Sequence, residues 1–280
     1  MKTQLLMFTT AIISLFGLTS CFQVESTITV KKDGSGTITE EMILGEQMQM
    51  MINMAAAQGG QGGAGAGQNP MDKMLDKEKA AARAKKMGEG VELVSVEKID
   101  VDGKLGVKTT FKFADINKLN YSADGAIDMG DIPGAAGAKA EKAADAGLKF
   151  ELVDGKLVII QKAPKAEKGA EKDGEAPAGD KPAGGDADMD PQMMAMMQGM
   201  MKDMRVTTKL VIEAGIVKTD ASHVDGNTII LSDIQMGKIM ANPEKLKAIQ
   251  SGDFEKTKDA LKGVDGIKFE DKERVSVEMK

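Results

Sequence analysis

The sequence holds few of the residues that most often carry chemistry. Its 280 residues include one cysteine, one histidine, one tyrosine and no tryptophan. A single cysteine excludes a disulfide within the chain, so stability in an oxidising compartment has to come from packing. The scarcity of aromatic residues and a formal net charge of −6 leave little for nucleic acid to bind, and we expect no nucleic acid among the partners.

Long apolar runs are absent except at the beginning of the chain. Lys2 precedes an apolar segment from Leu5 to Leu18, which is too short to span a membrane and is typical of an export signal. The segment ends in Leu18-Thr19-Ser20-Cys21, which resembles the lipobox of bacterial lipoproteins. The resemblance implies a signal peptide over residues 1–20, signal recognition through Leu18, Thr19 and Ser20, and cleavage before Cys21.

Lipid attachment at Cys21 is what the lipobox implies for the mature chain. The sulfur takes a diacylglyceryl group and the new amino group takes a further acyl chain such as palmitate, and two or three chains anchor a protein stably. Phe22 follows in place of the aspartate that retains a lipoprotein in the inner membrane under enteric-type sorting, which favours the outer membrane where the host has one. The alternative is an ordinary signal peptide with a chance or buried cysteine.

Alternating apolar residues and turn dipeptides predict antiparallel hairpins. In the first hairpin Val24, Ile28 and Val30 share one face. Four dipeptides mark the turns: Asp33-Gly34, Asp102-Gly103, Asp154-Gly155 and Asp225-Gly226. Strands over residues 206–217 and 228–231 flank the last turn, and residues 275–279 alternate again.

Helices are predicted over residues 46–57, 70–87, 190–204 and 254–261. The first two form an antiparallel pair, in which Pro70 stands in the first turn of its helix and Gly88 ends it. Hairpins interleaved with helices predict an α+β fold, an antiparallel sheet covered on one face by a few helices.

Low-complexity stretches divide the chain. They are rich in Gly, Ala, Gln and charge and have too few large apolar residues to offset the entropy of ordering them. We expect an N-terminal α+β part over residues 21–162 with mobile inserts near 58–69 and 122–146. A disordered linker over 163–190 leads to a C-terminal helix-plus-strands part over 191–280, packed on the same sheet.

Methionine is abundant, and it concentrates between residues 189 and 204. Met193, Met197, Met200 and Met204 follow helical spacing and form one stripe. Thioethers suit Cu(I), so the stripe is a candidate copper site, although such sites usually add a histidine or cysteine. The interpretation that we favour is packing against the sheet or an earlier methionine-bearing helix. The surplus methionines leave a groove for a hydrophobic ligand as a third interpretation.

His223 is the one histidine that could act as a general base. Such a base needs a nucleophile and an orienting partner, and on an extended segment the adjacent Ser222 points to the opposite face. We interpret His223 as a turn or strand-end residue. We expect no catalytic residue, no cofactor and no enzymatic activity.

Three segments resemble exported lipoproteins of the mycobacterial LppM-type group: Lys31-Lys32-Asp33-Gly34-Ser35-Gly36, Met87-Gly88-Glu89-Gly90-Val91, and the stretch from Phe111 to Leu119. This resemblance covers the smaller part of the chain and implies a lipid-binding surface domain, but it transfers no site residue. The linker from Ala163 to Asp190 departs from a compact member of that group. We therefore expect a membrane-anchored, non-enzymatic envelope protein that binds an envelope partner or has a structural role. A carrier of a hydrophobic ligand and a Cu(I)-binding protein are the alternatives.

Overall fold

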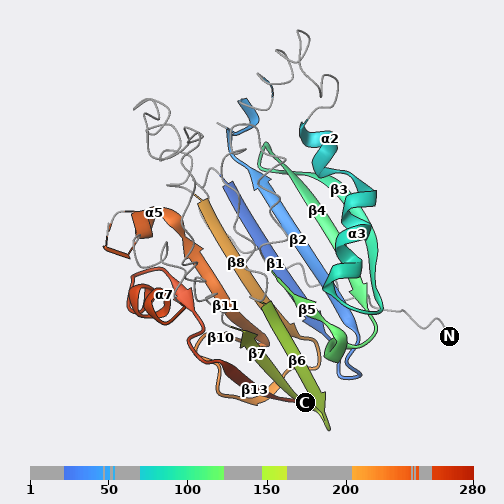
Figure 1. The fold of residues 1–280 in the computed structure, drawn as a ribbon, viewed down its shortest axis with the longest axis vertical. Coiled ribbons are helices and arrows are strands. Elements are labelled where there is room, and N and C mark those ends of the chain that lie inside the picture. Colours follow the sequence, from blue (N-terminus) through green and yellow to red (C-terminus); the bar gives the residue numbers. More distant parts are fainter. Residues whose placement is uncertain are drawn as a thin grey trace, which may run out of the picture.

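Two β-sheets and a few helices make up the protein, as the expectation of mixed strands and helices requires (Figure 1). The structure is a computed structural model, and it describes residues 22–46, 48–50, 53, 70–122, 147–162, 204–240, 242, 244–245 and 254–280. The expected inserts and the linker lie outside these residues, apart from Ser122.

Sheet A is the larger sheet, and its strands come from both parts of the chain. Its strands are β1 (Phe22–Val30), β2 (Gly36–Leu44), β3 (Val91–Val101), β4 (Lys104–Phe113), β8 (Met204–Ile212), β10 (Val224–Asp225), β11 (Thr228–Gln235) and β12 (Lys268–Phe269). Their order is β10-β11-β8-β1-β2-β4-β3, with β12 against β11. Neighbours run antiparallel except β1 and β8, which run parallel with Phe22 beside Met204 and Val30 beside Ile212.

Sheet B contains five strands in the order β5-β6-β7-β13-β9. These are β5 (Asn120–Tyr121), β6 (Gly147–Val153), β7 (Lys156–Lys162), β13 (Arg274–Met279) and β9 (Ile216–Thr219). Asp154 and Gly155 both adopt positive φ in the turn between β6 and β7, as Asp102 and Gly103 do between β3 and β4. The alternation predicted for the last strand is confirmed, because Val275, Val277 and Met279 are its buried residues.

The main core lies between the two sheets. Ile28 and Leu210 from sheet A belong to the same buried cluster as Ile159, Val275 and Val277 from sheet B. In β1 every second residue is buried, since successive side chains of a strand point to opposite faces. Sheet A therefore has an inner face against sheet B and an outer face, which is polar along β1.

The helices are short: α2 (Pro70–Met74), α3 (Lys77–Met87), α5 (Met236–Met240), α7 (Phe254–Leu261) and the 3-10 turn η1 (Ile116–Lys118). The helix expected over residues 70–87 is two helices, because the Asp76 side chain accepts hydrogen bonds from the amides of Glu78 and Lys79 and caps α3. Gly88 ends α3 with a φ of 147°, as expected. The expected helix over residues 254–261 is α7.

Two expectations about the sheet need correction. The strand expected over residues 206–217 ends at Ile212, and the chain turns at Gly215, with a φ of 88°, to enter sheet B as β9. A single straight strand cannot pair in sheet A and in sheet B, so the turn at Gly215 divides the expected strand into β8 and β9. The sequence predicted a few helices as the cover of the sheet, whereas the inner face of sheet A is covered by sheet B in addition to helix α3 on β3.

Candidate functional site

The expected lipid attachment residue directly precedes an interior strand of sheet A. The following residues of interest lie outside the described part of the chain: Leu18, Thr19, Ser20, Cys21, Met193, Met197 and Met200. Phe22 is the first described residue, and it is also the first residue of β1. Because β1 is bonded to β2 on one side and β8 on the other, no spacer separates position 21 from the folded body.

The end of sheet A that contains Phe22 has an apolar cluster of its own, which we call the anchor-end cluster. Its buried members are Phe22, Val24, Leu44, Met48, Met71, Val96 and Val107. Met42, Met74 and Met204 pack against it with partly buried side chains. Met204 opens β8, so the expectation that a helix runs through this residue is wrong at Met204. Several methionines of the described residues therefore lie in the cluster that contains Phe22, the residue after Cys21.

A buried polar network lies on the inner face of sheet A. Both Nη atoms of Arg83 on α3 donate to the carboxylate of Glu40 on β2. The Tyr121 hydroxyl on β5 donates to Glu40 Oε1 at 2.9 Å. Arg83 also lies over the ring of Phe111, with its Cζ 5.7 Å from the ring centroid. The Glu40 carboxylate on β2 therefore binds both helix α3 and strand β5 of sheet B to sheet A.

Further polar residues extend this network into a row across the sheet. Ser26 on β1 is paired in register with Glu40 on one side and with Thr208 on the other, and all three are buried. The row falls between Val24, in the anchor-end cluster, and Ile28, in the main core. It divides the inner face of sheet A into two apolar compartments.

The chemistry of the network is that of a structural clamp. Burial, and then the charge of Glu40, raise the pKa of Tyr121 well above its usual range, so the phenol stays protonated and acts as a donor. The Glu40 carboxylate accepts hydrogen bonds from the Arg83 guanidinium and from Tyr121. These groups were not predicted from the sequence, although Glu40 shares the alternation of Ile38 and Met42 and so had to face inwards.

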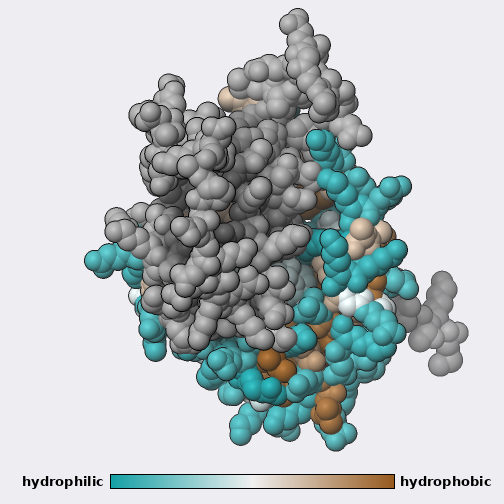
Figure 2. Space-filling view, in the orientation of Figure 1, coloured by the Kyte–Doolittle hydropathy of each residue, from teal (hydrophilic) through white to brown (hydrophobic). Residues whose placement is uncertain are grey.

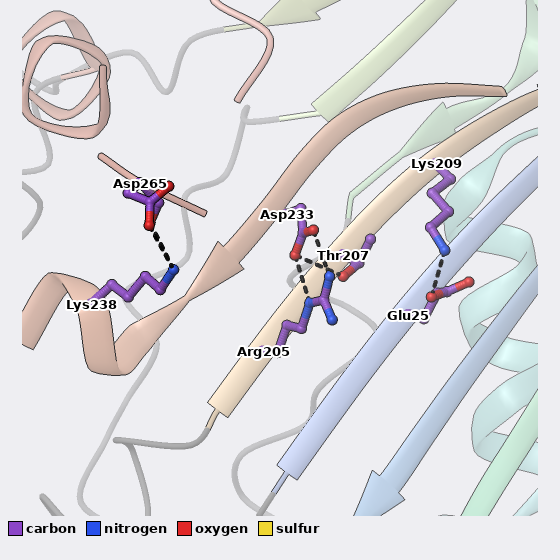
Figure 3. A network of polar contacts seen from close by, with 7 residues as sticks. All are labelled: Glu25, Arg205, Thr207, Lys209, Asp233, Lys238 and Asp265. Carbon is purple, nitrogen blue, oxygen red and sulfur yellow. Dashed lines mark hydrogen bonds and ion pairs between the residues drawn. The ribbon is translucent and has the colours of Figure 1, made fainter. Parts of the chain in front are cut away.

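The outer face of sheet A carries paired charges from neighbouring strands (Figure 3). The Nε and Nη2 atoms of Arg205 each donate to Asp233 at 2.7 Å, and these bonds raise the pKa of the Arg205 guanidinium. Lys209 donates to Glu25 at 2.8 Å. Thr207 completes the group, with its hydroxyl 3.4 Å from Asp233. Positive and negative groups compensate one another within these two pairs, so the pairs give this face no excess of one charge.

The outward side of sheet B has a small apolar patch. Val153 is exposed, and Val158 and Ile160 on the same side of β6 and β7 are partly exposed. Figure 2 shows hydrophobic residues at the lower end of the molecule, in the region where Figure 1 places these strands. The pair of Arg274 with Glu151, at 2.9 Å, adjoins the patch, so polar groups limit its extent.

His223 lies in a loop that a buried carboxylate holds in place. The backbone amide and hydroxyl of Ser222 donate to Glu270 at 2.6 and 3.0 Å, and the Glu270 side chain is fully buried. The carbonyl of His223 accepts from the amide of Ile230 at 2.9 Å. Ser222 is thus bonded to Glu270, and the loop arrangement agrees with a turn residue at His223.

Among the described residues, no group of three or more His, Cys, Asp or Glu side chains has the geometry to hold a metal ion. Within the same residues, no helix is both long and apolar enough to cross a membrane.

Comparison with known proteins gives one distant structural likeness. No protein-family model matches the sequence, and no curated protein matches it significantly. The chain is similar to the NMR structure of the folded domain of LppM from Mycobacterium tuberculosis, with 10% sequence identity and a TM-score of 0.33. The match covers 80% of this chain and 88% of that one. At this TM-score the two backbones differ too much for a property of LppM to pass to this chain.

Proposed function

We propose that the protein is a bacterial lipoprotein, held at the cell envelope by acyl chains on Cys21, whose folded part has a binding or structural role and no catalytic one. The observation that carries the proposal is the position of the lipobox cysteine directly before Phe22, where the folded body begins. An export signal that ends in a lipobox and joins a β-strand without a spacer supplies an anchor and a body in one chain. Phe22 in place of aspartate supports the outer membrane as the location.

The non-catalytic role is supported by what the polar side chains bind. Glu40 accepts from Arg83 and Tyr121, Asp233 accepts from Arg205, and Glu270 accepts from Ser222. These three carboxylates are buried and bond to neighbouring elements of the fold, so we assign them a structural role. They stabilise the body that the lipid would hold at the membrane.

Detergent phase partition of the expressed full chain tests the proposal. We expect the wild-type protein in the detergent-rich phase and Cys21→Ala in the aqueous phase, because only the former has acyl chains. Lys32→Ala is the matched control: it changes an exposed residue in the β1–β2 turn, outside the lipobox, and should partition like the wild type. Wild-type protein that partitions with Cys21→Ala would refute lipid anchoring.

A carrier of a hydrophobic ligand is the second candidate function, and the anchor-end cluster favours it. This cluster contains several methionines, whose unbranched thioether side chains adapt to ligands of varied shape. Titration of delipidated protein with a fluorescent fatty acid tests the idea. Saturable binding that falls in a Met42→Glu variant, but not in Val153→Glu at the opposite end, would support a carrier. Absence of uptake would exclude it.

A further inference from the structure

We propose that the anchor end of sheet A faces the bilayer, with the strands of sheet A upright on the membrane and sheet B held away from it. This inference rests on the proposed lipid attachment at Cys21. It concerns the surface that meets the membrane, which the attachment alone does not determine, since a protein on a long tether could turn any face to the lipid.

The absence of a spacer fixes the position of Phe22. Consecutive Cα atoms are about 3.8 Å apart, so Phe22 is one such step from the residue that would take the lipid. Phe22 is buried and is paired with Leu44 on β2 and Met204 on β8. To turn away from the membrane, β1 would have to break ladders on both of its sides, which exposes unpaired backbone groups. The end of the sheet therefore stays close to the headgroups.

Strand register shows which other residues share that end. Gln235, the last residue of β11, is paired with Arg205, the second residue of β8. Val30, at the other end of β1, is paired with Gly36 and Ile212. With a rise of about 3.3 Å per residue, the two ends of β1 are ~26 Å apart. The anchor end and the far end are thus well separated for a depth measurement.

The tip of the β3–β4 hairpin projects beyond the anchor end of β1 and β2. Ile43 on β2 is paired with Gly106 on β4, and the same register puts Leu105 level with Leu44. Asp102 at the exposed tip is three residues beyond Leu105, which corresponds to ~10 Å of strand. This tip is therefore expected to reach the headgroups.

The chemistry of the anchor end suits a lipid surface without a special headgroup. Met50 follows β2 with 64% of its surface exposed, and the anchor-end cluster contains further methionines. The exposed charges on α2 are one acid and one base, Asp72 and Lys73, and the hairpin tip has the exposed acids Asp100 and Asp102 near Lys104. Because these residues carry no excess of positive charge, contact with the bilayer should not need anionic lipid. A zwitterionic phosphatidylcholine bilayer is the partner that we assign.

Sheet B and the C-terminus lie at the far end. The amide of Lys280 donates to Gly215, whose own amide donates to Ile212 at the end of β8. The amide of Met279 donates to Gly155 in the β6–β7 turn, which places Asp154 near the same end. Figure 1 shows α2 and the C-terminus at opposite ends of the molecule. Asp154 is therefore the counterpart of Asp102 away from the membrane.

Site-specific labelling can measure this orientation in the full, lipidated chain. Cys21 is the one cysteine of the sequence, so once its sulfur is acylated an introduced cysteine is the one reactive thiol. Asp102→Cys and Asp154→Cys form a matched pair, because both residues are exposed, have positive φ and precede glycine in a hairpin turn. Lys73→Cys on α2 and Lys32→Cys in the β1–β2 turn form a second pair without positive φ, should the first pair fold poorly.

Each variant is labelled with a fluorophore and reconstituted in phosphatidylcholine vesicles that contain a headgroup-level nitroxide lipid, and acylation of Cys21 is checked by mass on the same sample. We expect quenching at positions 102 and 73 to be several-fold stronger than at positions 154 and 32. Equal quenching within the pairs, or stronger quenching at position 154, in acylated protein would overturn the orientation and leave the anchor intact. An unacylated Cys21 would overturn the proposed function itself.

Discussion

Removal of Arg83 should destabilise the fold far more than removal of an exposed lysine. Glu40 has 6% of its side chain exposed and Arg83 has 21%, and both guanidinium Nη atoms bond to the carboxylate. Loss of one partner of a buried ion pair costs roughly 3–5 kcal/mol, because the other charge is left without compensation. Since water reaches part of Arg83, and Tyr121 still donates to Glu40, we expect the lower end, about 3 kcal/mol for Arg83→Met.

Urea denaturation of the Cys21→Ala protein, followed by circular dichroism, measures this cost. For a urea dependence of about 3 kcal/mol per molar, the Arg83→Met midpoint should fall by ~1 M. Lys112→Met is the matched control, since it breaks the exposed pair of Lys112 with Glu92 and should cost less than about 1 kcal/mol. The double variant Glu40→Met/Arg83→Met leaves no buried charge and should recover most of the loss. Equal midpoints for Arg83→Met and Lys112→Met would refute the reasoning.

Three further predictions concern single residues. Tyr121, the one tyrosine, should show no tyrosinate absorbance in the folded protein at pH 11 but should titrate near pH 10 in urea. Because folding raises the pKa of Tyr121, its contribution to stability should be full below about pH 10 and fall as the pH rises above this value. Folded protein in which Tyr121 titrates near pH 10 would contradict this prediction. Gly36→Ala places a Cβ in steric overlap with the backbone oxygen of Thr29 on β1 and should cost about 3 kcal/mol or more in the same urea assay, against ~1 kcal/mol for Gly155→Ala, which meets no atom within 4 Å. Equal costs would argue against the tight β1–β2 contact. Glu270→Gln replaces an acceptor of two hydrogen bonds from Ser222 and should speed amide exchange in that loop, and unchanged exchange would show that Glu270 does not hold it.

Local patterns were sufficient to predict much of the first sheet. The alternation in β1 follows from period-two patterning, because Val24, Ile28 and Val30 are buried on one face. The parallel pairing of β1 with β8 could not be predicted, since residues about 180 positions apart in the sequence carry no local signal for it. The separation of β9 from β8 depends on a turn at Gly215, which resembles many other glycine positions.

The sequence predicts the lipid attachment residue but does not predict the buried polar network. The lipobox is a contiguous motif, so four adjacent residues were enough to predict lipid attachment at Cys21, and this attachment stays a prediction. The network of Glu40, Arg83 and Tyr121 is assembled from three distant elements, and its one local signal was an acidic residue at an inward-facing strand position. The methionine stripe at residues 193–200 lies outside the described residues, and its role stays a prediction.

Mass spectrometry of the N-terminal peptide from the exported, membrane-extracted protein tests the central claim most directly. The account predicts a mature chain that begins at Cys21, with a thioether-linked diacylglyceryl group on its sulfur and an acyl chain on its amino group. A peptide with a free thiol at Cys21, or a mature chain that begins at another residue, would contradict it.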